Sequence, residues 1–152
     1  MLKAKLDSVR KNKKGFSLVE LIIVIAIMVA LIAVLAPSYI KYVQKSRKSA
    51  YENACEEYLS AVKEKYADPD NTEYSGYGSI TIAVPNGTSS FTGLLTSSGN
   101  LKGDFSKIGN AGDKKLAKVD STGYGAFKIE IASDGDTGNY VITMKQVSVS
   151  AS

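Results

Sequence analysis

A run of sixteen unbroken apolar residues, LIIVIAIMVALIAVLA at positions 21–36, constrains this chain more than any other feature of its sequence. Extended back to Phe16, the segment has about 21 residues and makes roughly 31 Å of helix at 1.5 Å per residue. That length matches the ~30 Å hydrocarbon core of a bilayer. Because such a helix is apolar on every side, it belongs in lipid or inside a core made of protein.

The basic residues that give the chain its net charge are concentrated before this segment. The formal charge of the whole chain is +4. Residues 1–15 hold six cations and one acid, whereas residues 16–152 hold 13 cations and 14 acids. The larger part of the chain is therefore close to neutral, and it shows no electrostatic footprint for specific nucleic-acid binding.

The cysteine and histidine content excludes several kinds of site. Cys55 is the only cysteine and the chain has no histidine. These counts exclude an intrachain disulfide, a serine or cysteine triad that needs an imidazole, and a histidine-based zinc site. The sequence also lacks a phosphate-binding loop and a paired-cysteine metal motif. We therefore predict that the chain is not an enzyme, with no catalytic residues, no cofactor and no metal ligands.

The apolar run continues into a second helical pattern beyond Pro37. Apolar residues recur at helical spacing with polar residues between them, at Tyr39, Val43, Ala50, Ala54, Tyr58, Val62 and Tyr66. The pattern predicts one long helix over about residues 17–66, apolar in its first half and amphipathic in its second. Pro37 is the expected kink, because proline removes the hydrogen bond to the carbonyl of Ala33.

Beyond residue 70 the composition shifts toward glycine, serine and threonine, and apolar residues alternate in residues 79–84, 126–132 and 139–145. This alternation predicts half-buried antiparallel strands. The sequence SDGDTG between the last two predicts a hairpin loop. Residues 85–125 are expected to be rich in loops, with one short strand near residues 116–119. The predicted fold class is α+β: a long bent N-terminal helix with a small antiparallel β-sheet packed on its C-terminal half.

Two general interpretations of residues 1–40 follow from the apolar run alone. The first is a secretory signal peptide cleaved after residues 34–36, but Pro37 would follow the cut and the run exceeds the usual ~7–15 apolar residues. The second is a plain membrane anchor for an external domain. It explains the length and the basic flank, but it leaves Glu20 unexplained, because a charge in a lipid-facing helix is costly.

A third interpretation comes from the sequence KKGFSLVELIIVIAI at positions 13–27, which resembles the processing and assembly signal of type IV pilins and pseudopilins. The resemblance covers about residues 10–60 and rests on Gly15, Phe16, Glu20, the apolar run and Pro37. It implies that a prepilin peptidase cleaves after Gly15 and methylates the new amino terminus at Phe16. Two features depart from many relatives. No glycine precedes Pro37 within the apolar run, and Cys55 alone cannot close a C-terminal disulfide loop.

Glu20 has two interpretations. Ser17 and Glu20 fit the S-x-x-E capping box, in which the carboxylate satisfies backbone N–H groups at the positive end of a helix. The family resemblance implies a further role in subunit assembly. In a filament, the amine that cleavage creates at Phe16 of one subunit would pair with Glu20 of an adjacent subunit, and a misplaced subunit would leave a buried charge unpaired.

The resemblance divides the chain into a basic leader peptide at 1–15, a transmembrane and filament-core helix at 16–37, an amphipathic helix at 38–68 and a globular β-rich head at 69–152. It implies a single-pass protein of the cytoplasmic (inner) membrane with its N-terminus inside, and an extracellular pilus filament after assembly. The implied partners are further copies of the chain, the prepilin peptidase, the pilus assembly machinery, and the lipid bilayer before assembly.

The predicted function is that of a structural subunit, a major pilin that polymerises into type IV pili after cleavage and N-methylation. Such pili serve adhesion, surface motility, aggregation or DNA uptake. One alternative is a pseudopilin of a type II secretion or competence apparatus. The other is a monomeric membrane-anchored external binding domain.

Overall fold

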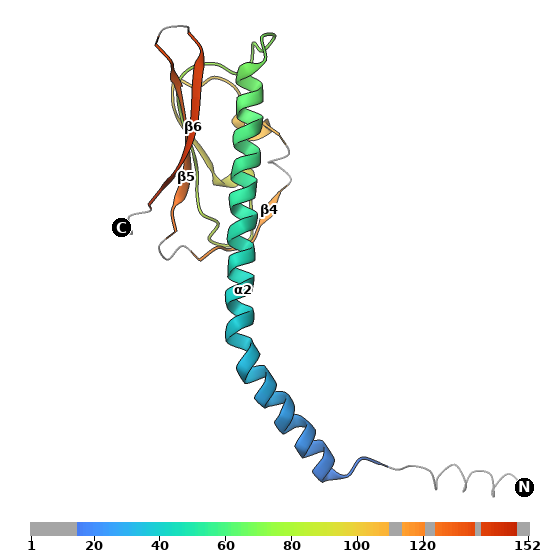
Figure 1. Cartoon of the computed structure of the whole chain (residues 1–152). Helices are drawn as coiled ribbons and strands as arrows, with labels where there is room; N and C mark the ends of the chain where they lie inside the picture. Colours follow the sequence, from blue (N-terminus) through green and yellow to red (C-terminus); the bar gives the residue numbers. More distant parts are fainter. Residues whose placement is uncertain (1–14, 110–113, 121–123, 136–137, 149–152) are drawn as a thin grey trace, which may run out of the picture. The chain divides into compact units, whose positions relative to one another are not determined.

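The computed structural model describes residues 15–109, 114–120, 124–135 and 138–148 (Figure 1). The chain forms two compact units, Met1–Lys41 and Tyr42–Ser152. The leader predicted at 1–15 lies outside the described residues except for Gly15.

Helix α2, Leu18–Ala67, has 50 residues and confirms the long helix predicted over residues 17–66. The chain remains helical through Pro37, and the kink expected there stays a prediction. Large apolar side chains between Phe16 and Ile40 are exposed by 49 to 89%. The helix includes a span that is long and apolar enough to cross a membrane, and none of that span is buried.

The second unit contains a four-stranded antiparallel sheet in the order β3-β1-β5-β6. Its strands are β1, Gly78–Ile82; β3, Leu95–Gly99; β5, Ala126–Ser133; and β6, Tyr140–Val147. Strands β1, β5 and β6 confirm the three predicted strands. The hairpin expected between β5 and β6 is confirmed by their register, which runs from Ser133↔Tyr140 to Ala126↔Val147.

The segment between β1 and β5 is more ordered than the sequence predicted. It contains β2, Ser89–Ser90, paired with β4, Lys115–Leu116, and two 3₁₀ helices, η1 at Phe91–Leu94 and η2 at Phe105–Lys107. The short strand expected near residues 116–119 corresponds to β4, whereas β2 was not predicted and neither was β3. That strand exposes most of its side chains and lacks apolar alternation, so pairing of its backbone with β1 forms it.

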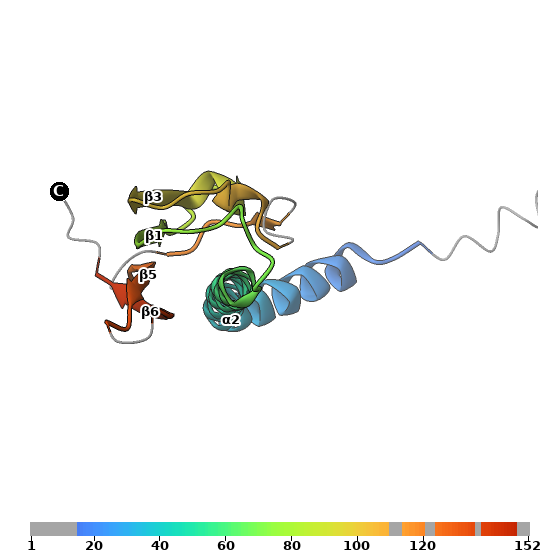
Figure 2. The same ribbon diagram turned by 90° about the horizontal axis from the view of Figure 1, so that it is seen from above.

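The core lies between the second half of α2 and the inner face of the sheet (Figure 2). From the helix it receives Tyr51, Ala54, Cys55, Tyr58, Val62 and Tyr66. From the sheet it receives Ile80, Ile82, Ile129 and Ile131. This arrangement confirms the α+β fold class with a sheet against the C-terminal half of the helix.

The buried tyrosines place their hydroxyl groups on backbone carbonyls. Tyr51 Oη donates to Ile82 O at 2.8 Å, and Tyr58 Oη donates to Phe105 O at 2.9 Å. Tyr58 and Tyr66 of the predicted helical period are buried, and Tyr51 is buried on the same face. Tyr39 and Ala50 of that period are exposed. A tyrosine can be buried where its hydroxyl finds an acceptor.

Candidate functional site: the amino-terminal end of helix α2

Ser17 and Glu20 form the capping box that the sequence predicted. The backbone N–H of Ser17 donates to Glu20 Oε2 at 3.0 Å, and the backbone N–H of Val19 donates to Ser17 Oγ at 3.4 Å. Two N–H groups without helical partners are thereby satisfied at the start of α2. Ser17 and Glu20 are both exposed to their surroundings.

The capping bond leaves part of the Glu20 carboxylate for another donor. Oε2 accepts the N–H of Ser17, while a carboxylate has two oxygens and about four lone-pair sites. Oε1 can therefore accept from a cation outside this chain without loss of the cap. The two interpretations of Glu20 are thus geometrically compatible.

Gly15 and Phe16 precede the cap and are both exposed. The φ angle of Gly15 is not positive, and a Cβ built on this residue would meet nothing within 4 Å. The Phe16 side chain is 89% exposed. The local structure therefore gives no steric reason for a glycine at position 15, so its reason must lie outside the fold of the single chain.

The apolar surface of α2 follows directly after this site. The carboxylate of Glu20 lies in the first turn, where it interacts favourably with the positive end of the helix dipole. Beyond it, the helix offers apolar side chains in all directions with no cover from the rest of the described chain. The site thus combines a capped helix start, one carboxylate and an uncovered apolar surface.

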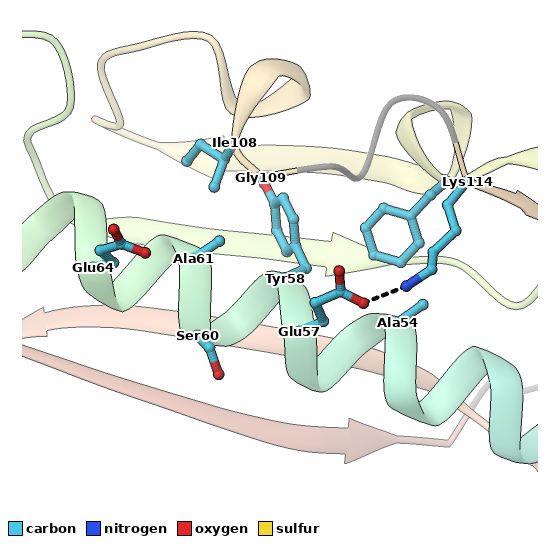
Figure 3. A pocket seen from close by; sticks show the side chains of 10 residues that line it. Ala54, Glu57, Tyr58, Ser60, Ala61, Glu64, Ile108, Gly109 and Lys114 are labelled. Atoms are coloured by element: carbon cyan, nitrogen blue, oxygen red, sulfur yellow. Dashed lines mark hydrogen bonds and ion pairs between the residues drawn. The ribbon is translucent and has the colours of Figure 1, made fainter.

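The head contains a hollow of about 270 Å³ between α2 and the segments around η1 and η2 (Figure 3). Tyr58, Phe91 and Ile108 line its inner part, and an ion pair between Glu57 and Lys114 lies at its edge. Within residues 15–109, 114–120, 124–135 and 138–148, no group of three or more His, Cys, Asp or Glu side chains is placed to hold a metal ion.

Cys55 is a free cysteine with 0% exposure in the core. Burial raises the pKa of its thiol to about 12, and the hydrogen bond with Tyr51 opposes that shift. The thiol is therefore protonated at neutral pH and acts as a small apolar side chain.

Comparisons with known proteins match this end of the chain and also most of its length. The family model for the prokaryotic N-terminal methylation motif matches residues 10–36. The chain is also similar to the fimbrial protein EcpC of Eikenella corrodens, with 29% identity over 140 residues that cover 84% of this chain and 87% of the relative. No solved structure matches the chain. This end of the chain thus matches a prokaryotic N-terminal methylation motif, and most of the chain is similar to a fimbrial protein.

Proposed function

We propose that the chain is the major subunit of a type IV pilus, made as a precursor in the cytoplasmic membrane and assembled into an extracellular filament. Residues 1–15 act as a leader on the cytoplasmic side, and residues 16–37 span the bilayer once. The amphipathic helix at 38–68 and the head at 69–152 lie outside. The six cations in residues 1–15 support this orientation, because basic residues favour the cytoplasmic side of a membrane span.

The observation that carries the proposal is the uncovered apolar surface of α2 in a chain whose head already has a complete core. Exposed apolar patches of this extent mark a membrane or protein interface. Lipid would cover the surface before assembly, and the same segment of other copies would cover it in a filament. The head needs no residue of this segment for its own packing.

Processing would create the second element of the interface. Cleavage after Gly15 leaves a positively charged amine at Phe16, which is methylated. Glu20 of a neighbouring copy is the carboxylate available to meet it, since its Oε1 is not used by the cap. Burying this pair between apolar helices would fix the register of the subunits, because a displaced subunit would leave a charge buried without a partner.

Mass spectrometry of the mature protein tests the processing step. We expect a chain that begins at a methylated Phe16, with residues 1–15 removed. A matched variant, Gly15→Leu, should keep the leader, whereas Glu20→Val should still lose it. An intact amino terminus in the unmodified protein would contradict the proposal and favour a plain membrane anchor.

Electron microscopy of surface filaments tests the assembly step. As the major subunit, the chain should dominate filaments sheared from the cell surface, and deletion of its gene should remove them. Correct processing without surface filaments, with the chain confined to short structures in the envelope, would contradict the role of a major subunit. That result would instead identify a pseudopilin.

A further inference from the structure

Strand β6 is an end strand of the four-stranded sheet, and β5 is its only partner among the described strands (Figure 2). Its eight residues pair with β5 in an unbroken register, and none of them is proline. Proteins usually shorten, kink or cover such edges, because a long regular edge can pair with another chain. β6 therefore has an uninterrupted backbone edge with which a strand of another chain could pair.

The hydrogen bonds of the hairpin show which backbone groups of β6 face the free edge. The N–H of Asp134 donates to Asn139 O at 3.1 Å, so these residues form a hydrogen-bonded pair one step beyond Ser133↔Tyr140. Hydrogen-bonded and non-hydrogen-bonded pairs alternate in antiparallel sheets. The odd-numbered residues of β6 therefore direct their N–H and C=O groups to β5. The groups directed to the free edge belong to Tyr140, Ile142, Met144 and Gln146.

The outer face of β6 carries a distinctive pattern of side chains. Val141 is 44% exposed and Val147 is 39% exposed. In the described strands, these are the two large apolar side chains that are exposed to solvent. Thr143 and Lys145 lie between them on the same face. Lys145 Nζ lies 2.7 Å from Glu130 Oε2. Lys128 Nζ lies 3.2 Å from the other oxygen of the same carboxylate, so the two lysines share one acidic partner within their own subunit.

We propose that β6 docks against β6 of a second copy as an antiparallel pair, with the twofold axis at Met144. In this register, Val141 lies opposite Val147 of the second copy, and Val147 lies opposite its Val141. Thr143 lies opposite Lys145 of the second copy, so the two lysines do not face each other. The strand is thus self-complementary in its exposed valines, and no two lysines lie directly opposite each other.

Other registers of the same pair lose this complementarity. An axis at Thr143 places Val141 opposite Lys145 of the second copy. An axis at Lys145 places the two lysines opposite each other, which is unfavourable for like charges in a cross-strand pair. The axis at Met144 is the one that pairs the exposed valines with each other.

Space beside the edge is available for the second copy. A groove of about 680 Å³ lies between the end of α2 and the first half of β6, and Lys63, Tyr66, Tyr140 and Ile142 are among the residues that line it. In the proposed register, the residue of the second copy that lies opposite Tyr140 is the one directly after Val147 of that copy. Tyr66 of α2 packs against Tyr140, with ring centroids 4.6 Å apart, and the groove lies beside that contact.

The pairing goes beyond the proposed function, because it joins heads and needs neither cleavage at Gly15 nor assembly through Glu20. A twofold contact uses the same surface on both copies and closes on itself. It cannot propagate along one filament. In a surface filament, it would join subunits of two neighbouring filaments side by side.

Disulfide trapping in the full chain, purified in detergent micelles, tests the proposed contact. The variant Val141→Cys with Val147→Cys places the two cysteines opposite each other across the pair. These are non-hydrogen-bonded positions with Cα atoms about 4.5 Å apart, within the range that a disulfide spans. The native Cys55 is buried and should not react.

The matched control is Thr96→Cys with Ser98→Cys on the outer face of β3, the opposite end strand. Under a mild oxidant, we expect covalent dimers from the β6 variant at roughly tenfold or greater yield than from the control. Equal yields would show random collision and overturn the proposal. An absence of dimers from the β6 variant would overturn it as well.

A pair of charge variants tests the register. Val141→Lys with Val147→Glu places opposite charges across both valine positions, whereas Val141→Lys with Val147→Lys places like charges there. Both pairs of substitutions fall on exposed positions, so the head should fold in each case. Sedimentation in micelles, with Glu20→Val present to prevent assembly through the helix, should show dimer dissociation constants that differ on the order of tenfold. Equal constants would refute the axis at Met144.

Discussion

Glu20 caps its own helix and is proposed to bind a neighbouring subunit, and three substitutions separate these roles. Glu20→Gln keeps an oxygen that can accept the N–H of Ser17, since the capping box tolerates either residue, but it removes the charge. Glu20→Val removes both the cap and the charge. Ser17→Ala removes the hydroxyl that bonds to Val19 and keeps the carboxylate.

The two roles differ in expected magnitude. The bond from Val19 N–H to Ser17 Oγ is long at 3.4 Å, so its loss should cost about 0.5 kcal/mol, the low end of the range for such caps. Leaving one member of a buried ion pair without its partner costs about 3–5 kcal/mol. That penalty weakens each subunit contact by roughly 10²- to 10⁴-fold. Loss of the Glu20 charge should therefore weaken assembly much more than loss of the cap.

Filament yield, measured by electron microscopy in cells that lack the native gene, distinguishes the variants. We expect near-normal filaments from Ser17→Ala and none from Glu20→Gln or Glu20→Val, with processing at Gly15 intact in all three. Thermal unfolding of the head serves as the control. It should not change, because the buried residues of α2 begin at Tyr51. Normal filaments from Glu20→Gln would show that the cap alone matters and would refute the proposed charge pair.

Features that depend on short stretches of sequence were predictable. The length of α2 follows from a helical period that continues through Pro37, and its end follows from the acidic and proline residues after Ala67. The capping box is likewise encoded within four residues, Ser17 to Glu20, and the structure forms it. Cys55 was predictable as a buried apolar side chain because it lies on the same helical face as Tyr58 and Val62.

Strand β3 was not predictable by the same means. Its sequence, LTSSG, has one apolar residue, and four of its five positions are exposed. The strand forms because the edge of β1 that does not face β5 is available for pairing. Two hydrogen bonds flank the paired residues. Ala83 N–H donates to Leu94 O at 2.8 Å, and Asn100 N–H donates to Tyr77 O at 2.9 Å. Backbone pairing of this kind leaves no pattern in the side chains.

The edge position of β6 also required the structure. The sequence predicted a strand with Tyr140, Ile142 and Met144 on one face, and these side chains are partly buried against the core. It did not predict the strand order, which is what places β6 at the end of the sheet. Strand order depends on pairing between residues far apart in the chain, such as Ile80↔Ile129.

Two further predictions concern the tyrosines of the head. Tyr51→Phe should lower the free energy of unfolding by about 0.5–1.5 kcal/mol in chemical denaturation, because it removes the buried hydrogen bond from Tyr51 to the carbonyl of Ile82. Tyr77→Phe serves as the control. Its side chain is 45% exposed, so the free energy of unfolding should change by less than about 0.5 kcal/mol. Burial raises the pKa of Tyr66 from 10.0 to about 12, with a smaller contribution from Tyr140. Since the folded pKa lies above the unfolded one, this stabilisation is complete below pH 10.0 and is lost as the pH rises toward about 12. Burial likewise raises the pKa of Tyr51. Tyrosinate absorbance from these buried side chains should therefore appear together with the loss of helical circular dichroism at alkaline pH. Ionisation of every tyrosine near pH 10 with the helical signal intact would contradict the burial of these hydroxyl groups under the sheet.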